Sequence, residues 1–587
     1  MKIWKKAALS AVAVSLLSAT PAWAAKPKDH EDRLSNKEAW LKKLEEAQEA
    51  KEKVVEKGKG KVKAKAIKKL PAEMNRALQK IIKQLPELKD FEVSSAYINE
   101  GNEYQPETWE FELDNGKRGR EAEYAYIDLN AETGVLISYS FHTRDEEEGK
   151  APDYDTAKKK ADEFLAKIMT ADAKKYKVIE EDAEEEEEDE DKDDVGYKRF
   201  TYERMIHNIP LIGAEILIRV DSEGRVVYFR NESPFNIKDS SISKPKNVLS
   251  ENEADEKYSD LMDMELLYNK SEIIEYPADE DDEDEDDSVY KTKPVLKYEP
   301  GYSGPMDAVK GEIPKDLDLW EESKNEGKMF TISPKGEKLY APNQEAAEQL
   351  LKNVFGIDMS KFEMYDEDND EDEIYYSWES DSDDEDREIE IGVDAKTGEV
   401  IDFHIWHGED APQPKLTEEQ ALEYATTFVE RFIDTDIKEV QLRNVYQPVE
   451  KPKFPSWVDK DIIEEIEEEI EPEHTYRFSF YATHQGVPVE NDYFSVRVNS
   501  TTGDIEGFGY NLEDDVDLPD NENVASEKKA AKAYLKAQPL KLMYIYPEFF
   551  GYKAPKPILV YESEYTQAGY IDAFTGEFVP VKEAKKD

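Results

Sequence analysis

A short turn sequence recurs six times along the chain, and this repetition is the strongest constraint on its fold. Each occurrence begins with Asn or Asp and ends with Gly: Asn130–Gly134, Asp221–Gly224, Asp307–Gly311, Asp394–Gly398, Asn499–Gly503 and Asp572–Gly576. The first and fourth glycines are 264 residues apart, the second and fifth 279, and the third and sixth 265. An Asx side chain bonds the backbone ahead of it, and Gly supplies the positive φ that closes a hairpin. The spacing therefore predicts a tandem duplication of a block of three units.

The longest repeated stretch shows what surrounds these turns. Residues Tyr202–Phe229 return as Phe480–Phe508, with Arg219 matching Arg497 at an offset of 278 residues. In both copies apolar residues alternate with polar ones along the strands. This period of two, with one more polar face, predicts an antiparallel sheet covered on one side by a helix.

A helical pattern precedes the strands of every unit. The helices are expected to begin near Ala72, Asp155, Ser250, Asn343, Thr417 and Ser526. Ser250 with Glu253, and Thr417 with Gln420, have the spacing of capping boxes. We therefore predict an α+β fold of tandem small units, each a helix packed on an antiparallel sheet, in two homologous halves. The expected units are residues 72–150, 151–245, 246–335, 336–412, 413–520 and 521–587.

The N-terminal segment has the pattern of a signal peptide. Lysines at positions 2, 5 and 6 precede an apolar run from Ala7 to Leu17, and Pro21–Ala24 has small residues at a cleavage spacing. We expect residues 1–24 to be removed and the protein to be secreted, either extracellular or associated with the cell wall. Residues 25–71 are rich in Lys, Ala and Glu and are expected to form a basic arm, helical or disordered. We find no other apolar run of transmembrane length.

Charge and cysteine content exclude several kinds of partner and site. The formal net charge of −59 argues against nucleic acid, because phosphate binding needs clustered Lys and Arg. The chain has no cysteine, so disulfides, thiolate metal sites and Cys nucleophiles are excluded. Acidic runs at residues 180–194, 279–287 and 366–373 are interpreted as solvated loops inserted at a repeated place. Diffuse, weak binding of divalent cations or of basic partners is the alternative.

The search for catalytic and metal-binding motifs predicts none. No H-E-x-x-H, G-x-S-x-G or Gly-rich phosphate loop is present. Asp402, His404 and His407 form the nearest metal candidate, but on a strand Asp402 and His404 share a face while His407 lies on the other. His484 lies beside a turn without a Ser or Cys partner. We therefore expect no enzyme activity, no catalytic residue, no cofactor and no metal site, and the binding residues remain unknown.

One acidic run resembles a calcium-binding loop and then departs from it. Asp366, Asp368, Asp370 and Asp372 have the spacing of the first ligands of such a loop. Glu371, however, stands where the loop needs Gly, and position 377 is Ser where a bidentate Glu is needed. A specific calcium site is therefore not predicted here.

The order of these motifs resembles that of known protein families. A helix, alternating strands and an Asp-x-x-Thr-Gly turn are similar to the PepSY domain. Gln485–Val489, with its Gly-Val-Pro-Val turn, and the following strand and hairpin look like the YcdB/YcdC repeat family of secreted Bacillus-type proteins. The first copy, His207–Leu211, lacks the Gly. The resemblance covers roughly residues 90–582.

The resemblance implies a binding function. PepSY domains accompany thermolysin-like peptidases, with a proposed inhibitory or chaperone role, and the repeats imply no known activity and no catalytic residues. We therefore expect a secreted non-enzymatic protein that binds or restrains an extracellular peptidase, using sheet edges with aromatic residues such as Tyr476, Phe478 and Phe480. The alternatives are a cell-envelope structural protein held by charge to wall polymers or cations, and an uncharacterised hydrolase.

Overall fold

The structure is a computed structural model of the 587-residue chain. It describes residues 65–66, 70–99, 107–118, 121–143, 151–179, 196–232, 242–276, 290–317, 323–369, 373–380, 387–407, 412–449, 453–460, 462–463, 466, 473–513, 516–549 and 552–583. The signal segment, nearly all of the basic arm and the acidic runs at 180–194 and 279–287 lie outside these residues. The expectations for those segments stay predictions.

Six α-helices in the described residues begin where the sequence predicts. They are α3 Ala72–Ile82, α4 Tyr154–Met169, α6 Glu251–Leu261, α7 Gln344–Val354, α8 Glu418–Phe432 and α10 Glu527–Ala537. Both predicted capping boxes are present. In α8 the backbone N–H of Thr417 donates to the Gln420 side chain at 2.9 Å, which satisfies a free donor at the helix start. Three short 3₁₀ helices, Pro86–Leu88, Thr170–Lys175 and Met359–Lys361, connect elements.

The first of two large sheets has 12 strands in the described residues. In spatial order its main path is β1 Lys65–Ala66, β2 Glu92–Asn99, β3 Thr108–Asp114, β4 Glu123–Asn130, β5 Leu136–Thr143, β9 Val226–Asn231, β8 Ile209–Asp221, β22 Leu540–Ile545, β25 Ile558–Ser563 and β12 Met306–Asp307, with β6 Tyr176–Val178 and β7 Tyr197–Ile206 beside β8. Strand β1 corrects one expectation: Lys65 and Ala66 belong to the segment expected to be helical or disordered, yet they pair with β2. Edge pairing with a sheet overrides local propensity here.

The second sheet has 14 strands in the same part of the chain. Its path is β14 Phe362–Asn369, β15 Glu373–Ser380, β16 Arg387–Asp394, β17 Val400–His407, β21 Ile505–Asn511, β20 Val487–Asn499, β10 Met264–Tyr276, β11 Lys291–Pro300, β26 Gly569–Asp572 and β27 Glu577–Pro580, joined by β13 Met329–Thr331, β18 Glu439–Tyr446, β19 Thr475–His484 and β28 Lys582–Glu583. Strands β23 Glu548–Phe549 and β24 Tyr552–Lys553 form a separate hairpin. The fold is therefore α+β, with helices on antiparallel sheets and two homologous halves, as predicted.

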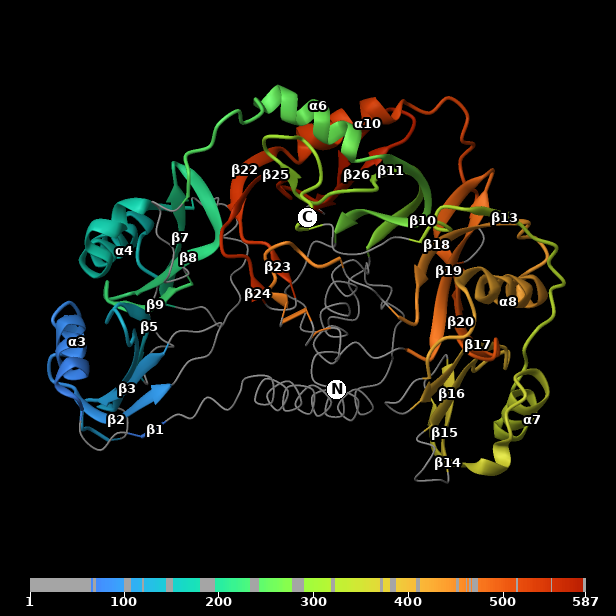
Figure 1. The fold of residues 1–587 in the computed structure, drawn as a ribbon, viewed down its shortest axis with the longest axis horizontal. Helices are drawn as coiled ribbons and strands as arrows, with labels where there is room; N and C mark the ends of the chain where they lie inside the picture. Colours follow the sequence, from blue (N-terminus) through green and yellow to red (C-terminus); the bar gives the residue numbers. More distant parts are fainter. Residues whose placement is uncertain are drawn as a thin grey trace.

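The two halves exchange their third units. Strand β10, from the first half, runs parallel to β20 of the second half, and β22, from the second half, runs parallel to β8 of the first half. The registers are equivalent: Tyr268 pairs with Val489, and Tyr544 pairs with Leu211. Figure 1 shows red β22 beside green β8 and green β10 beside orange β20. Each sheet is thus completed by strands that are distant in sequence.

The exchanged units share one core beneath α6 and α10. Two symmetry-related hydrogen bonds tie them together: the Tyr298 hydroxyl donates to the carbonyl of Ala525 at 2.7 Å, and the Tyr561 hydroxyl donates to the carbonyl of Leu249 at 2.9 Å. Both acceptors lie just before a helix of the other half. The units predicted at 246–335 and 521–587 are therefore interlocked, which the sequence pattern alone did not indicate.

The six repeated turns have the predicted geometry. Their final glycines all have φ between +59° and +83°. In the last turn the Asp572 carboxylate accepts from the backbone N–H of Thr575 at 2.8 Å, and the other five Asx side chains accept from backbone N–H groups in the same way. The turn is a structural element that returns each hairpin onto its helix.

The helices and sheets form an arch. In Figure 1, α3, α4, α7 and α8 lie towards the outer margin, α6 and α10 cover the top, and the sheets line the inner side. Core residues alternate along the strands and face the helices. None of the described helices packs on the opposite face of each sheet, which we call the helix-free face. The strand residues that alternate with the core residues point to this face.

Candidate functional site

A row of side chains crosses the helix-free face of the second sheet, and it contains His404, the histidine that the sequence singled out. Opposing positions on successive strands place these residues in line from β18 to β15: Tyr446, Arg477, Arg497, Gly507, His404, Glu390 and Ser377. Their neighbours along the strands, such as Phe478, Val496 and Phe403, are buried against the helices. The alternation of the strands therefore collects this polar row on one face.

The predicted aromatic edge is wrong. Strand β19 lies between β18 and β20 rather than at an edge. Tyr476, Phe478 and Phe480 are buried beneath α8, where Phe478 and Phe480 are fully inaccessible. Their period of two was correctly read as a strand, but the pattern does not distinguish a core face from a recognition face.

Glycines let the charged side chains lie flat on the sheet. A Cβ atom added at Gly507 would stand 2.9 Å from Cδ of Arg497 and 3.1 Å from Nδ1 of His404. A Cβ atom at Gly392 would stand 2.2 Å from Oδ1 of Asp402. These side chains occupy the space that a larger residue would take, so they are half-buried although none of the described helices covers them.

Asp402 and His404 share this face, as predicted, with 3.8 Å between Oδ2 and Nε2. Burial, followed by the negative charge of Glu390, raises the pKa of Asp402 to about 6. Burial and the charges of Arg497 and Arg477 lower the pKa of His404 to about 4. His404 is therefore neutral at pH 7, and its buried Nδ1 has no hydrogen-bond partner among the residues that the structure describes.

Arg477 and Arg497 stand directly opposite each other on β19 and β20. Neither guanidinium forms an ion pair with any residue that the structure describes, although Arg477 lies over the ring of Tyr446 at 5.4 Å. Burial, followed by the charge of Arg477, lowers the pKa of Arg497 to about 10. The carboxyl of Glu473 is close enough to interact with both charges, and burial raises its pKa.

The other histidines do not join this row. His407 lies on the opposite face, as predicted, with its Nε2 3.1 Å from the Glu506 carboxylate and its ring stacked on His474. His484 packs edge-on against Tyr268. Within the described residues no three His, Asp or Glu side chains are placed to hold a metal ion.

The segment that resembled a calcium loop is extended where the structure describes it. Asp366–Asn369 belongs to β14 and pairs with Ser377–Ile374 on β15. Residues 370–372 lie outside the described residues.

The same row exists in the first half, with different residues. From β7 it runs through Arg199, Arg219, Tyr228, Ser140, Tyr126 and Glu112. Tyr228 stands where the second half has Gly507, and Ser140 stands where it has His404. The guanidinium of Arg219 lies between the rings of Tyr197 and Tyr228, at 4.7 and 5.1 Å. Arg219 is thus covered by two aromatic rings, whereas in the second row Arg477 lies over the ring of Tyr446 and no such contact is seen for Arg497, the counterpart of Arg219, among the described residues.

The pairing of Arg477 with Arg497 was not predicted from the sequence. Aligning the two copies did match Arg219 with Arg497, but the partner strand positions become visible only with the register of β19 on β20. The glycines at 392, 507 and 509 were available as a signal, because glycine inside a strand marks a close approach by another group.

Comparison with known proteins agrees with the repeat architecture. The YcdB, YcdC repeated domain matches residues 60–233 and 344–512, one segment in each half. A solved structure with similarity is the C-terminal domain of Bacillus megaterium YpeB, with 15% identity over 46% of this chain and 100% of that chain and a TM-score of 0.10. No curated protein matches the chain. Because the two matched segments together cover more than half of the sequence, the chain belongs to the YcdB/YcdC repeated-domain family.

Proposed function

We propose that this protein is a secreted, non-enzymatic binding protein that holds an extracellular peptidase against the helix-free faces of its sheets and restrains it. The observation that carries the proposal is the exposure of large aromatic residues on these faces. Tyr446, Tyr493 and Trp406 are exposed in the second half, and Tyr124 and Tyr126 in the first. Tyrosine, tryptophan and arginine are enriched at the energetically important centres of protein interfaces.

The choice of a peptidase as partner is supported by the resemblance to PepSY domains, which is an argument from fold rather than from a site. Export is supported by the predicted signal peptide. The described helices include none that is long and apolar enough to cross a membrane.

The test is a titration of the mature chain into the secreted metallopeptidases of its host, with binding and peptidase activity both measured. We expect micromolar or tighter binding and reduced activity. The double variant Trp406→Ser/Tyr493→Ser should weaken binding at least tenfold, whereas Tyr565→Ser, an exposed tyrosine in the loop after β25, should leave it unchanged. Absence of binding at tens of micromolar by the folded protein would overturn the proposal.

A cell-envelope structural role is the second candidate, and the net charge of −59 favours it. A protein held by charge is released by salt, because the screening length is about 10 Å at 0.1 M. Deletion of residues 26–69 should then release the protein from cells as a high-salt wash does. Retention of the truncated protein would exclude the basic arm as the tether.

A further inference from the structure

We propose that Arg477, Arg497 and His404 form a receptor for one carboxylate group of a peptide ligand, and that only the second half of the chain presents it. We call these three residues the carboxylate receptor. The proposal deepens the proposed function, because the carboxylate would belong to the protein partner. It also has a test that does not need that partner.

The charges around the receptor require an explanation. The chain has 137 Asp and Glu against 78 Lys and Arg, so an arginine has many acids with which to pair. Arg477 and Arg497 nevertheless face each other without an ion pair within the described residues. Like charges directly opposite on adjacent strands are destabilising. The Glu473 carboxyl interacts with both charges but forms no ion pair with either guanidinium. An anion bound between the two guanidiniums would offset the remaining repulsion.

The donors of the receptor are held in place by their neighbours. The ring of Tyr446 packs on the guanidinium of Arg477, whose Nε is buried. Arg497 lies across Gly507 towards His404, whose Nδ1 is also buried. Neither nitrogen has a hydrogen-bond partner in the described part of the chain. Guanidinium groups bind carboxylates through parallel N–H···O bonds, and the neutral imidazole can donate one more. Three donors in one cross-strand row therefore suit a planar ligand with two oxygens.

The neighbouring acids favour a carboxylate over a phosphate. Glu473 interacts with both arginines, and Glu390 stands opposite His404 in the row, so acids at both ends of the receptor oppose additional negative charge on a ligand. A phosphate monoester carries nearly two negative charges at pH 7, and a carboxylate carries one. The site therefore discriminates in favour of the singly charged group.

The first half provides a closed copy of the same site. Its arginine pair, Arg199 and Arg219, has the same register. There Tyr228 covers Arg219, and Ser140 replaces the histidine. In the second copy Gly507 stands in place of Tyr228, so no ring from this position covers Arg497. One ligand per chain is the expected stoichiometry.

The experiment is isothermal titration calorimetry of the full chain at low salt with three probes. N-acetylphenylalanine presents a peptide-like carboxylate, its amide is the neutral matched control, and inorganic phosphate tests the anion class. We expect the acid to bind at one site per chain and both other probes to bind at least tenfold more weakly. Equal binding of acid and amide, tighter binding of phosphate, or no binding of the acid at tens of millimolar would overturn the receptor.

Variants of the arginines show which half of the chain binds the acid. Arg497→Gln and Arg497→Lys should each weaken the acid at least tenfold, the second because lysine lacks the guanidinium fork. Arg219→Gln, in the closed copy, should leave the affinity unchanged. Equal losses in Arg219→Gln and Arg497→Gln would contradict the assignment. Peptidase binding is measured separately. Binding of the acid without binding of a peptidase would contradict the proposed function alone, and binding of a peptidase without binding of the acid would contradict the receptor alone.

Discussion

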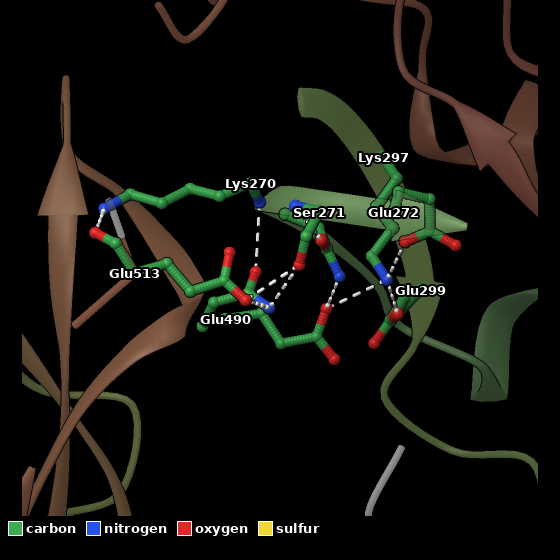
Figure 2. A network of polar contacts seen from close by, with 9 residues as sticks. Lys270, Ser271, Glu272, Lys297, Glu299, Glu490 and Glu513 are labelled. Carbon is green, nitrogen blue, oxygen red and sulfur yellow. Dashed lines mark hydrogen bonds and ion pairs between the residues drawn. The ribbon is translucent and has the colours of Figure 1, made fainter. Parts of the chain in front are cut away.

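The two junctions between the halves have the same backbone register and opposite chemistry. Where β22 meets β8, the core is the apolar cluster of Ile206, Leu211, Ala214 and Tyr544, and the one buried charge beside it in the described part of the chain is Arg204, opposite Leu211. Where β10 meets β20, a polar network is buried, and Figure 2 shows its two lysines and the acids around them. Lys297 is 2.8 Å from Glu272, 2.5 Å from Glu299 and 2.9 Å from Glu490.

The difference explains why the halves exchange their third units. Lys270 of β10 pairs with Asp492 at 2.8 Å, and Lys297 of the adjacent β11 pairs with Glu490, so the β10–β11 hairpin carries cations that need the acids of β20. In the first half, the positions of Glu490 and Asp492 are occupied by Ile212 and Ala214. If this hairpin joined β8 of its own half, it would place its lysines beside apolar residues, which is strongly unfavourable. The polar junction therefore selects the exchanged arrangement over the direct one.

Removal of a cation from the polar junction should have the largest effect. Lys297→Met would leave three carboxylates around a buried position, and the folded protein should lose about 3–5 kcal/mol of stability. Lys291→Met, on the same strand but with an exposed side chain paired to Glu275, is the control and should change stability by about 0–1 kcal/mol. Urea denaturation measures both. Equal small losses would mean that the network does not hold the junction.

The repeated turn has the same backbone geometry in both halves. The space around its glycine differs from turn to turn, so substitutions of these glycines should cost different amounts of stability. Gly576 has φ of +59°, and a Cβ atom there would stand 2.7 Å from Cβ of Ala525. Gly224 has φ of +76°, but its nearest neighbour, in Lys160, would be 3.8 Å away. Gly576→Val should therefore cost about 2–3 kcal/mol and Gly224→Val about 1–2 kcal/mol. Melting curves that rank the two variants in the reverse order would contradict the packing argument.

The raised pKa of Asp402, in the second half, predicts how the stability of the folded protein changes with pH. Its folded pKa of about 6 exceeds the ordinary Asp value, so the folded state holds the proton more tightly than the unfolded state. The stability of the wild type relative to Asp402→Asn should then fall as pH rises from about 4 to 6. The variant should be more stable by about 1–2 kcal/mol at pH 7.

Asp394→Asn is the control for this pH dependence. Hydrogen bonds from the side chain and backbone of Thr397 lower the pKa of Asp394, so its contribution is present at neutral pH and is lost as pH falls. Denaturation at several pH values should show opposite trends for the two variants. A difference for Asp402→Asn that does not vary with pH would exclude a raised pKa.

The arginines should show the smallest effects on stability. Arg219→Gln removes contacts with two aromatic rings and should cost about 1 kcal/mol. Arg497→Gln removes a half-buried charge without an ion pair and should cost less than about 0.5 kcal/mol, or stabilise the fold. Thermal denaturation of the two variants compares them directly. A larger loss for Arg497→Gln would indicate that this arginine serves the fold rather than a ligand.

Much of the fold could be predicted because it depends on local pattern. Helix starts at Ser250 and Thr417, and the turn glycines, follow from capping and backbone geometry within a few residues. The exchange of third units could not be predicted in this way, because β10 fits β8 and β20 equally well by hydrophobic alternation. It depends on charges such as Lys297 and Glu490 that are nearly 200 residues apart.

The candidate site was only partly predictable for the same reason. His404 and Asp402 are close in sequence, and strand periodicity placed them on one face. Arg477 and Arg497 lie in the same row as His404 because of the register between neighbouring strands, which the sequence pattern does not reveal. Phe478 and Phe480 were wrongly predicted to lie at an exposed edge, because a core strand and a recognition strand share the same alternation.

The two halves are copies of one scaffold, and we propose that the partner binds both helix-free faces but places its carboxylate on the second. Hydrogen–deuterium exchange of the complex with a bound peptidase compares the two faces. Bound peptidase should slow exchange more in β17, β20 and β21 than in β5, β8 and β9, their counterparts. Protection that is equal or greater in the first half, or that is confined to the helical side of the arch, would show that this assignment is wrong.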